Sequence, residues 1–121
     1  FKRIAKKNTF FKDLIKSCDI GLSTVVLNLN FLKKNKFFFP SIKTKEDYVL
    51  WLKIIKKIKI IKGIKTKLSS YRKTKNSLSS SKILSLQNGF KVYRNYMYYG
   101  FFKSLFYLIL LSLNYVKKLL F

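Results

Sequence analysis

The sequence contains no histidine, one cysteine and only four acidic residues among its 121 positions. Without histidine, the chain cannot by itself form a Ser-His-Asp triad, a Cys-His pair or a histidine-ligated metal site. The single Cys18 excludes an intrachain disulfide or a cysteine zinc cluster, and it is most simply a small buried residue. Acid–base chemistry must therefore come from Asp13, Asp19, Glu46 or Asp47, unless a lysine or tyrosine has a strongly shifted pKa.

Cationic and apolar side chains dominate what remains. The 27 Lys and Arg residues give a formal net charge of +23, yet 49% of the chain is hydrophobic, including 12 Phe and 8 Tyr. This composition excludes a simple disordered basic tail and predicts one folded domain. Only Arg3, Arg72 and Arg94 are arginines, whereas nucleic-acid readers favour arginine. We interpret the charge as a lysine-rich background that favours anionic lipid and phosphate.

The start of the chain predicts a longer protein. The first residue is Phe1, and the basic opening that follows lacks the apolar core of a signal peptide. We therefore expect the chain to be the tail of something longer.

The first half of the chain shows three local patterns. Residues 10–17 are typical of a short helix, and the β-branched run at 22–29 predicts a buried strand. The sequence TKED at 44–47 predicts a helix start, with Thr44 and Asp47 as a capping pair. Apolar residues then recur at spacings of three and four, while Lys53, Lys56 and Lys57 are expected to face water; the apolar stripe comprises Tyr48, Trp51, Leu52, Ile55 and Ile58.

The second half begins with a stretch broken by Gly63, which predicts a strand, a turn and a second strand ending near Tyr71. A polar loop follows. Residues 82–99 then predict an amphipathic helix with a weak point at Gly89, and Gly100 separates it from the last segment. The helical stripe of 82–99 comprises Ile83, Leu86, Phe90, Tyr93 and Met97.

The last segment, 100–121, is strongly apolar. Between Lys103 and Lys117 lie 13 uncharged residues, fewer than the roughly 20 needed to cross a bilayer as a helix. We expect an interfacial helix with aromatics and lysines at its ends. Two alternatives stay open: a span from Met97 to Val116, or a core helix whose partner lies elsewhere in a longer chain.

Three segments, in this order and at this spacing, together resemble the second half of family 2 glycosyltransferases that build bacterial surface polysaccharides such as teichuronic acids. They are CDIGLSTVVL at 18–27, TKEDYVLWLKI at 44–54 and YRKTKNSLSSSK at 71–82. The resemblance implies an α/β fold class, namely the C-terminal, acceptor-side portion of a nucleotide-diphospho-sugar transferase (GT-A) fold followed by C-terminal helices. It divides the chain into 1–81, the acceptor-side part, 82–99, an amphipathic helix, and 100–121, an apolar interfacial helix.

The resemblance also implies site residues. The catalytic base of the family falls on Asp47, with Glu46 as its companion. Trp51 would shape an acceptor pocket, and Ser23 and Thr24 would lie at its edge. The family's mobile loop, which closes over the donor diphosphate, falls on the segment that contains Tyr71, Arg72, Lys73, Ser77 and Ser79.

The resemblance further implies a nucleotide-sugar donor, a glycan or lipid-linked acceptor and transfer with inversion. The family carries a metal-binding Asp-x-Asp that this sequence lacks. The divalent metal, Mg or Mn, is therefore expected to be held mostly by a missing N-terminal half, and the chain is expected to be inactive alone. We expect a cytoplasmic location, peripheral on the inner face of the membrane.

Each of these assignments has a plainer alternative. From spacing alone, Thr44 and Asp47 are a helix cap, Trp51 is a core residue and the 71–82 loop is a solvated connection. Two other functions compete with sugar transfer: a basic nucleic-acid-binding module, and a small cationic protein of the membrane surface.

Overall fold

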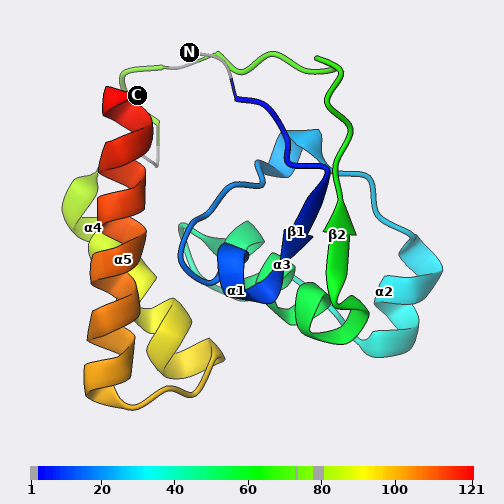
Figure 1. Cartoon of the computed structure of the whole chain (residues 1–121). Coiled ribbons are helices and arrows are strands. Elements are labelled where there is room, and N and C mark those ends of the chain that lie inside the picture. The colour runs from blue at the N-terminus through cyan, green and yellow to red at the C-terminus, as the bar shows by residue number, and fades with distance from the viewer. Residues whose placement is uncertain (1–2, 73, 78–80) are drawn as a thin grey trace.

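The computed structural model describes residues 3–72, 74–77 and 81–121, and it combines a small sheet with several helices (Figure 1). The mixed helix-and-strand class predicted from the sequence is confirmed at this level. In chain order the elements are β1 (Asn8–Phe10), α1 (Phe11–Leu14), the 3-10 turn η1 (Leu22–Thr24), α2 (Leu29–Asn35), α3 (Glu46–Ile58), β2 (Ile60–Lys62), α4 (Lys82–Lys91), the π-helical turn η3 (Val92–Tyr96) and α5 (Phe101–Leu120).

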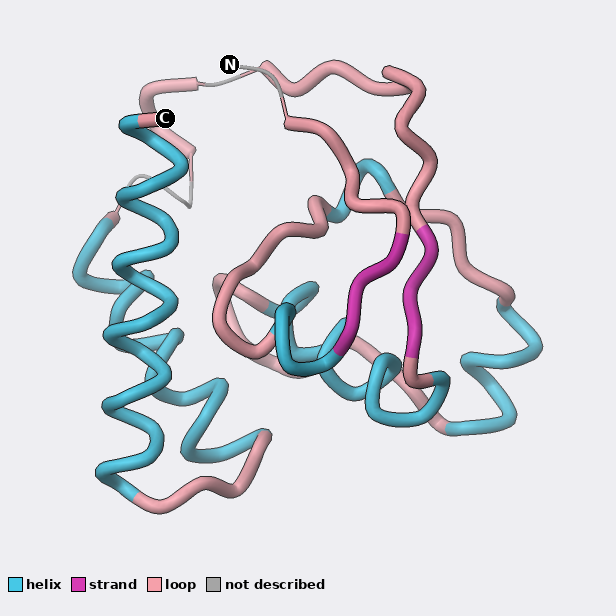
Figure 2. Tube along the Cα trace, in the orientation of Figure 1, coloured by secondary structure: helices cyan, strands magenta, loops and turns pink. Residues whose placement is uncertain are grey.

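The sheet consists of β1 and β2, which run antiparallel and lie side by side in Figure 2. Thr9 pairs with Ile61 at the centre of this register. Just past β2, the Gly63 amide donates to the Lys7 carbonyl at 3.0 Å. A Cβ on Gly63 would lie 2.3 Å from the Lys6 carbonyl oxygen, so only glycine fits where the two backbones meet.

Helix α3 supplies most of the core. The apolar positions predicted from its spacing are buried as far as Ile55, whereas Ile58 at its end is exposed. Lys56 and Lys57 face solvent as predicted. Lys53, for which the same is predicted, is instead half-buried, and its ammonium lies 5.5 Å from the centre of the Tyr96 ring. The buried residues of α3 are Tyr48, Val49, Leu50, Trp51, Leu52, Ile54 and Ile55.

Helices α4 and α5 form a second layer beside this core, on the left of Figure 1. The predicted helix at 82–99 forms as α4 and η3, but only the later part of its stripe, Tyr93 and Met97, is fully buried. Ile83 and Leu86 are exposed. Gly100 ends the connection and precedes α5, as predicted. Gly89 lies inside α4, where the absence of a side chain lets Leu108 of α5 approach closely.

The predicted buried strand at 22–29 is wrong. Residues 22–24 form η1, and Val26 is 99% exposed. The Asn28 side chain accepts from the Phe31 amide at 3.1 Å and so caps α2, which starts a helix where the strand was expected to end. Among the described residues the sheet contains only β1 and β2, so the β-branched run has no neighbouring strand with which to pair.

The predicted hairpin around Gly63 is also wrong. Its first strand exists as β2, but β2 pairs with β1, from the start of the chain. Within 64–72 and 74–77, the part of this segment that the structure describes, the backbone forms no helix or strand. A long-range pairing has replaced the local one that the sequence suggested.

Candidate active site

The acidic pair Glu46 and Asp47 opens α3, and both residues are half-buried. The predicted capping pair does not form. The residue before the helix is Lys45, in the left-handed conformation at φ 65°, and its side chain makes no cap hydrogen bond. The Thr44 hydroxyl instead accepts from the Asn88 amide at 2.8 Å, so α4 holds the segment that leads into the acidic pair.

Asp47 lies in an environment that raises the pKa of its carboxyl. Burial is the main cause, and the neighbouring Glu46 charge adds to it. The Tyr48 amide donates to Asp47 Oδ1 at 2.7 Å and Lys45 lies nearby, but these favourable contacts do not offset the burial. The position of Asp47 at a helix start and its lysine neighbours would by themselves favour the ionised form, but burial outweighs them. The result is a more basic carboxylate.

Neither carboxylate of the acidic pair forms an ion pair within the part of the chain that the structure describes. The ion pairs go to Asp19 instead, which contacts both Lys118 and Lys6. Burial acts to raise the pKa of Asp19, but hydrogen bonds from Lys118 and Ser17 and the two lysine charges lower it overall. Asp19 is thus a structural ion-pair partner, while Glu46 and Asp47 remain available to a ligand.

Cys18 is a titratable group next to this site. The sequence predicts that it is a small buried residue. It is half-buried, and its pKa is raised to about 11, first by burial and then by the Asp47 charge. The thiol therefore stays neutral near pH 7 and acts as a small apolar neighbour of the carboxylate.

Trp51, one turn after Asp47, is fully buried and borders an apolar pocket of about 220 Å³. Its indole Nε1 has no hydrogen-bond partner among the described residues. Ser23 and Thr24 do not line this pocket; both are exposed in η1, where Thr24 donates to the Gly21 carbonyl at 2.7 Å. The pocket is lined by Ile20, Val25, Val26, Leu27, Trp51, Ile54, Ile58, Ile60, Ile61 and Lys62.

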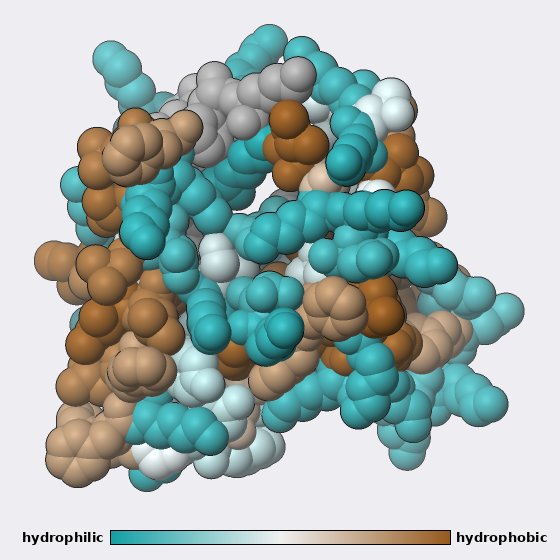
Figure 3. All heavy atoms as spheres, viewed as in Figure 1, coloured by the Kyte–Doolittle hydropathy of each residue, from teal (hydrophilic) through white to brown (hydrophobic). Residues whose placement is uncertain are grey.

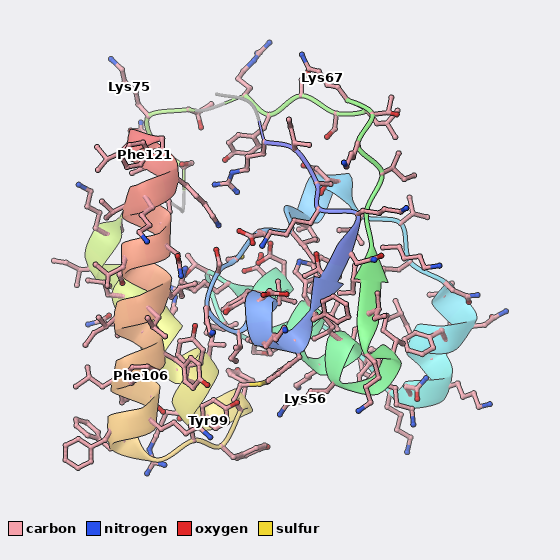
Figure 4. All side chains as sticks on the ribbon, viewed as in Figure 1. Lys56, Lys67, Lys75, Tyr99, Phe106 and Phe121 are labelled. Atoms are coloured by element: carbon pink, nitrogen blue, oxygen red, sulfur yellow. The ribbon has the colours of Figure 1, made fainter. Side chains whose placement is uncertain are left out.

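The loop predicted to contact a diphosphate lies apart from the acidic pair. Tyr71 is 75% exposed, Arg72 is exposed and Ser77 is half-buried. Lys73 and Ser79 lie outside the described residues. In Figure 4 Lys67 and Lys75, from the same connection, lie along the top of the molecule, away from α3. The structure therefore does not bring the loop beside Asp47, and its role stays a prediction.

The part of the chain that the structure describes does not by itself form a divalent-metal site. Among the described residues, no group of three or more His, Cys, Asp or Glu side chains is close enough to hold an ion.

Two contributions to the site were missed at the sequence level. Asn88 is buried in α4 and positions Thr44. The feature of the sequence that could have indicated this role is a polar residue among the apolar positions of a helix. Tyr93 contacts Tyr48, the residue after Asp47, through its hydroxyl at 3.1 Å. No local pattern marks that pairing, because the two tyrosines are 45 positions apart.

Comparison with curated proteins gives two relatives. The chain is 29% identical over 114 residues to the "Putative teichuronic acid biosynthesis glycosyltransferase TuaG" of Bacillus subtilis (strain 168), a match that covers 94% of this chain and 44% of TuaG. It is 39% identical over 93 residues to the "UDP-Glc:alpha-D-GlcNAc-diphosphoundecaprenol beta-1,3-glucosyltransferase WfgD" of Escherichia coli, covering 75% of this chain and 35% of WfgD.

These matches confirm the resemblance carried by the three segments: the chain is related to glycosyltransferases. It spans less than half the length of either relative. No family model matches the chain, and no solved structure matches it. The nucleic-acid alternative is not favoured by these findings.

Proposed function

We propose that this chain is the acceptor side of an inverting family 2 glycosyltransferase of the GT-A fold. The enzyme would transfer a sugar from a nucleotide-diphospho-sugar to a glycan or a lipid-linked acceptor. The observation that carries the proposal is the pair Glu46 and Asp47, half-buried at the start of α3 with no ion pair among the described residues. The two glycosyltransferase relatives support the reaction class.

Asp47 is the proposed general base. A sugar hydroxyl is a weak nucleophile. A carboxylate within hydrogen-bond reach must therefore take the hydroxyl proton while the hydroxyl oxygen attacks the anomeric carbon of the donor sugar. The new bond joins the acceptor oxygen to that carbon, and the bond to the diphosphate breaks on the opposite face, which inverts the centre. The raised pKa of Asp47 makes the carboxylate a better proton acceptor. Glu46 would orient the acceptor or a cationic partner.

The donor side of the proposal rests on the loop. Arg72 and the hydroxyls of Tyr71 and Ser77 would donate hydrogen bonds to phosphate oxygens if the loop moved toward the acidic pair. The Asp-x-Asp of the family is not in this sequence, and the described residues offer no metal cluster. We therefore assign no step to a metal held by this chain.

A lipid-linked acceptor is the more specific form of the proposal. The printed name of WfgD describes an acceptor on a diphosphoundecaprenol lipid, and such a lipid lies in a bilayer. The proposed enzyme would accordingly act at the cytoplasmic face of the membrane as a peripheral protein. Trp51 and its apolar pocket would form a wall of the acceptor site.

The test is the variant Asp47→Asn, made in the protein as it occurs in the cell and assayed with a UDP-sugar and a diphosphoundecaprenol-linked acceptor. We expect turnover to fall by about a hundredfold or more, the usual effect of removing a general base. Asp13→Asn, which removes the same charge at α1, is the matched control and should retain activity. Full turnover of Asp47→Asn would remove Asp47 as the base.

A further inference from the structure

The outward face of α5 is an unbroken apolar stripe. Its residues recur at spacings of three and four, so they lie on one side of the helix. From the first to the last residue the stripe runs about 27 Å, at about 1.5 Å per helical residue. All of its members are exposed: Phe102, Leu105, Phe106, Ile109, Leu113, Val116 and Leu120.

The inward face of α5 carries both apolar and polar contacts. Ser104 and Leu111 are buried there, and Tyr107 packs against the Tyr93 ring at 5.6 Å. Further along, Asn114 donates to the Lys16 carbonyl at 3.0 Å, and Lys118 pairs with Asp19. Unlike the usual surface helix, which is polar on its outer side, α5 is therefore apolar on its outward face as well as on part of its inward face.

This stripe is part of a wider apolar surface. Figure 3 shows hydrophobic side chains gathered along the left edge of the molecule, over α5. Ile83 and Leu86 of α4 are exposed, and an open groove lined partly by Leu86, Phe90 and Leu108 joins the two helices. Exposed apolar patches of this extent on a protein usually mark a binding surface.

The charges around the stripe favour an anionic partner. No acidic residue follows Asp47 in the sequence, so α4 and α5 carry only cationic charges. Lys103, whose ammonium lies 4.1 Å from the centre of the Tyr99 ring, and Lys117 lie near the two ends of α5. A second copy of this face would bring like charges together, whereas an anionic lipid surface would neutralise them.

The shape of the helix fits a position in the plane of a bilayer. Among the described residues no helix is long and apolar enough to span a membrane. Aromatic residues lie at both ends of α5, Phe101 and Phe102 at the start and Tyr115 and Phe121 at the end. Rings at both ends and apolar side chains along one face are typical of helices that lie at the boundary between headgroups and acyl chains.

We propose that the outward face of α5 docks this chain onto an anionic lipid bilayer, with the helix lying in the membrane plane and the body of the protein above it. The choice of lipid as the occupant rests partly on the proposed function, because a lipid-linked acceptor must be reached at a membrane. The exposed apolar face of α5 and the one-signed charge of α4 and α5 stand independently of it.

The test is co-sedimentation of the protein as it occurs in the cell, the form used in the transfer assay, with vesicles of phosphatidylglycerol and phosphatidylcholine in equal parts. The face variant is Ile109→Ser with Leu113→Ser. The matched control, Ile64→Ser with Leu68→Ser, makes the same changes at residues that are exposed outside α5. We expect the face variant to bind about tenfold or more weakly, since it loses two inserted aliphatic side chains, and the control to bind like the parent. Circular dichroism of both variants should match the parent.

Several results would overturn the proposal. If the face variant bound as tightly as the parent and salt released all of the protein, the attraction would be charge alone. If the parent bound phosphatidylcholine vesicles equally well, the lysines would have no part. If the parent were a dimer that the face variant dissociated, with no lipid binding, the occupant would be a second copy.

The outcome is separable from that of the proposed function. Transfer to a soluble acceptor without the lipid tail depends on Asp47 and not on the outward face of α5. Failure of vesicle binding with Asp47-dependent transfer intact would remove the docking proposal alone, and vesicle binding without transfer would remove only the enzymatic one.

Discussion

The hydroxyl oxygens of Tyr48 and Tyr93 lie 3.1 Å apart in the core, and each hydroxyl also donates to a backbone carbonyl at the end of α1. Tyr48 donates to Leu14 at 2.7 Å and Tyr93 donates to Ile15 at 2.8 Å. The two rings meet edge to face at 86°. Because Tyr48 follows Asp47 directly, this pair fixes the first turn of α3 against both α1 and η3.

The tyrosine pair gives the first prediction. Tyr93→Phe leaves the buried Ile15 carbonyl without its donor, and we expect it to lower the free energy of unfolding by about 1–2 kcal/mol. Tyr48→Phe should have a similar effect through Leu14. The double variant should deviate from the sum of the single effects, because the two hydroxyls contact each other. Urea denaturation of all four proteins measures the coupling, and strict additivity would show that the hydroxyl contact has no energetic role.

The raised pKa of Asp47 predicts a trade-off between activity and stability. The folded state holds the Asp47 proton more tightly than the unfolded state, so stability falls as pH rises from the ordinary value of 3.8 through the raised pKa. Asp47→Asn removes this cost while keeping an oxygen to accept from the Tyr48 amide.

We therefore expect Asp47→Asn to be slightly more stable than the parent at neutral pH, measured by its urea midpoint. The gain should vanish at a pH below the ordinary carboxyl pKa, where both proteins are neutral at this position. A variant that is less stable at neutral pH would show that ionised Asp47 has a stabilising contact in the fold.

Asp19 gives a prediction of the opposite sign. Its pKa is lowered, so the stability it contributes is present above the ordinary value of 3.8 and is lost as pH falls through the lowered pKa. Asp19→Asn should cost about 1 kcal/mol at neutral pH, since it breaks the partly buried pair with Lys118.

The structural consequence of Asp19→Asn should be local. Amide hydrogen exchange should quicken in the last turns of α5, where Lys118 is held, and not in α3. Asp13→Asn, with the same loss of charge elsewhere, should leave exchange in α5 unchanged. Unchanged exchange in Asp19→Asn would mean that the packing of Leu111 holds the helix without the ion pair.

Gly63 gives a prediction about the sheet. In Gly63→Ala the new Cβ would meet the Lys6 carbonyl oxygen at 2.3 Å, and a backbone atom cannot move aside as a side chain can. We expect a loss of about 1–3 kcal/mol, the usual cost of overpacking. Gly100→Ala is the matched control, because a Cβ there has no atom within 4 Å. Thermal denaturation of the two variants compares them, and equal midpoints would show that β1 and β2 separate easily.

Much of the local structure follows from sequence patterns. The helix opening at Glu46, the helix from Lys82 and the break at Gly100 can all be predicted, because periodicity and glycine act over a few residues. The structure predictions are wrong where a segment distant in the sequence determines the local structure. β2 takes β1 as its partner across some fifty positions, and the run at 22–29 finds no strand to join.

The candidate site divides in the same way. The acidic pair can be found from its residue types and its place before an amphipathic helix. Its immediate surroundings cannot be predicted in this way. The hydrogen bond from Asn88 to Thr44 joins residues 44 positions apart, and the burial that raises the pKa of Asp47 is a property of the folded chain. The relation of Asp47 to Tyr71 and Arg72 likewise depends on the path of a long connection, which no local pattern specifies.

The sequence alone determined which chemistry this protein can use and where helices such as α3 and α4 begin, because residue types and short-range spacing are local properties. The absence of histidine and the presence of only four acidic residues restrict the catalytic candidates to a few side chains. Only the tertiary structure decided which face of α5 turns inward. Asn114 and Lys118 find partners in the 16–19 segment, and those long-range contacts leave Ile109 and Leu113 facing outward.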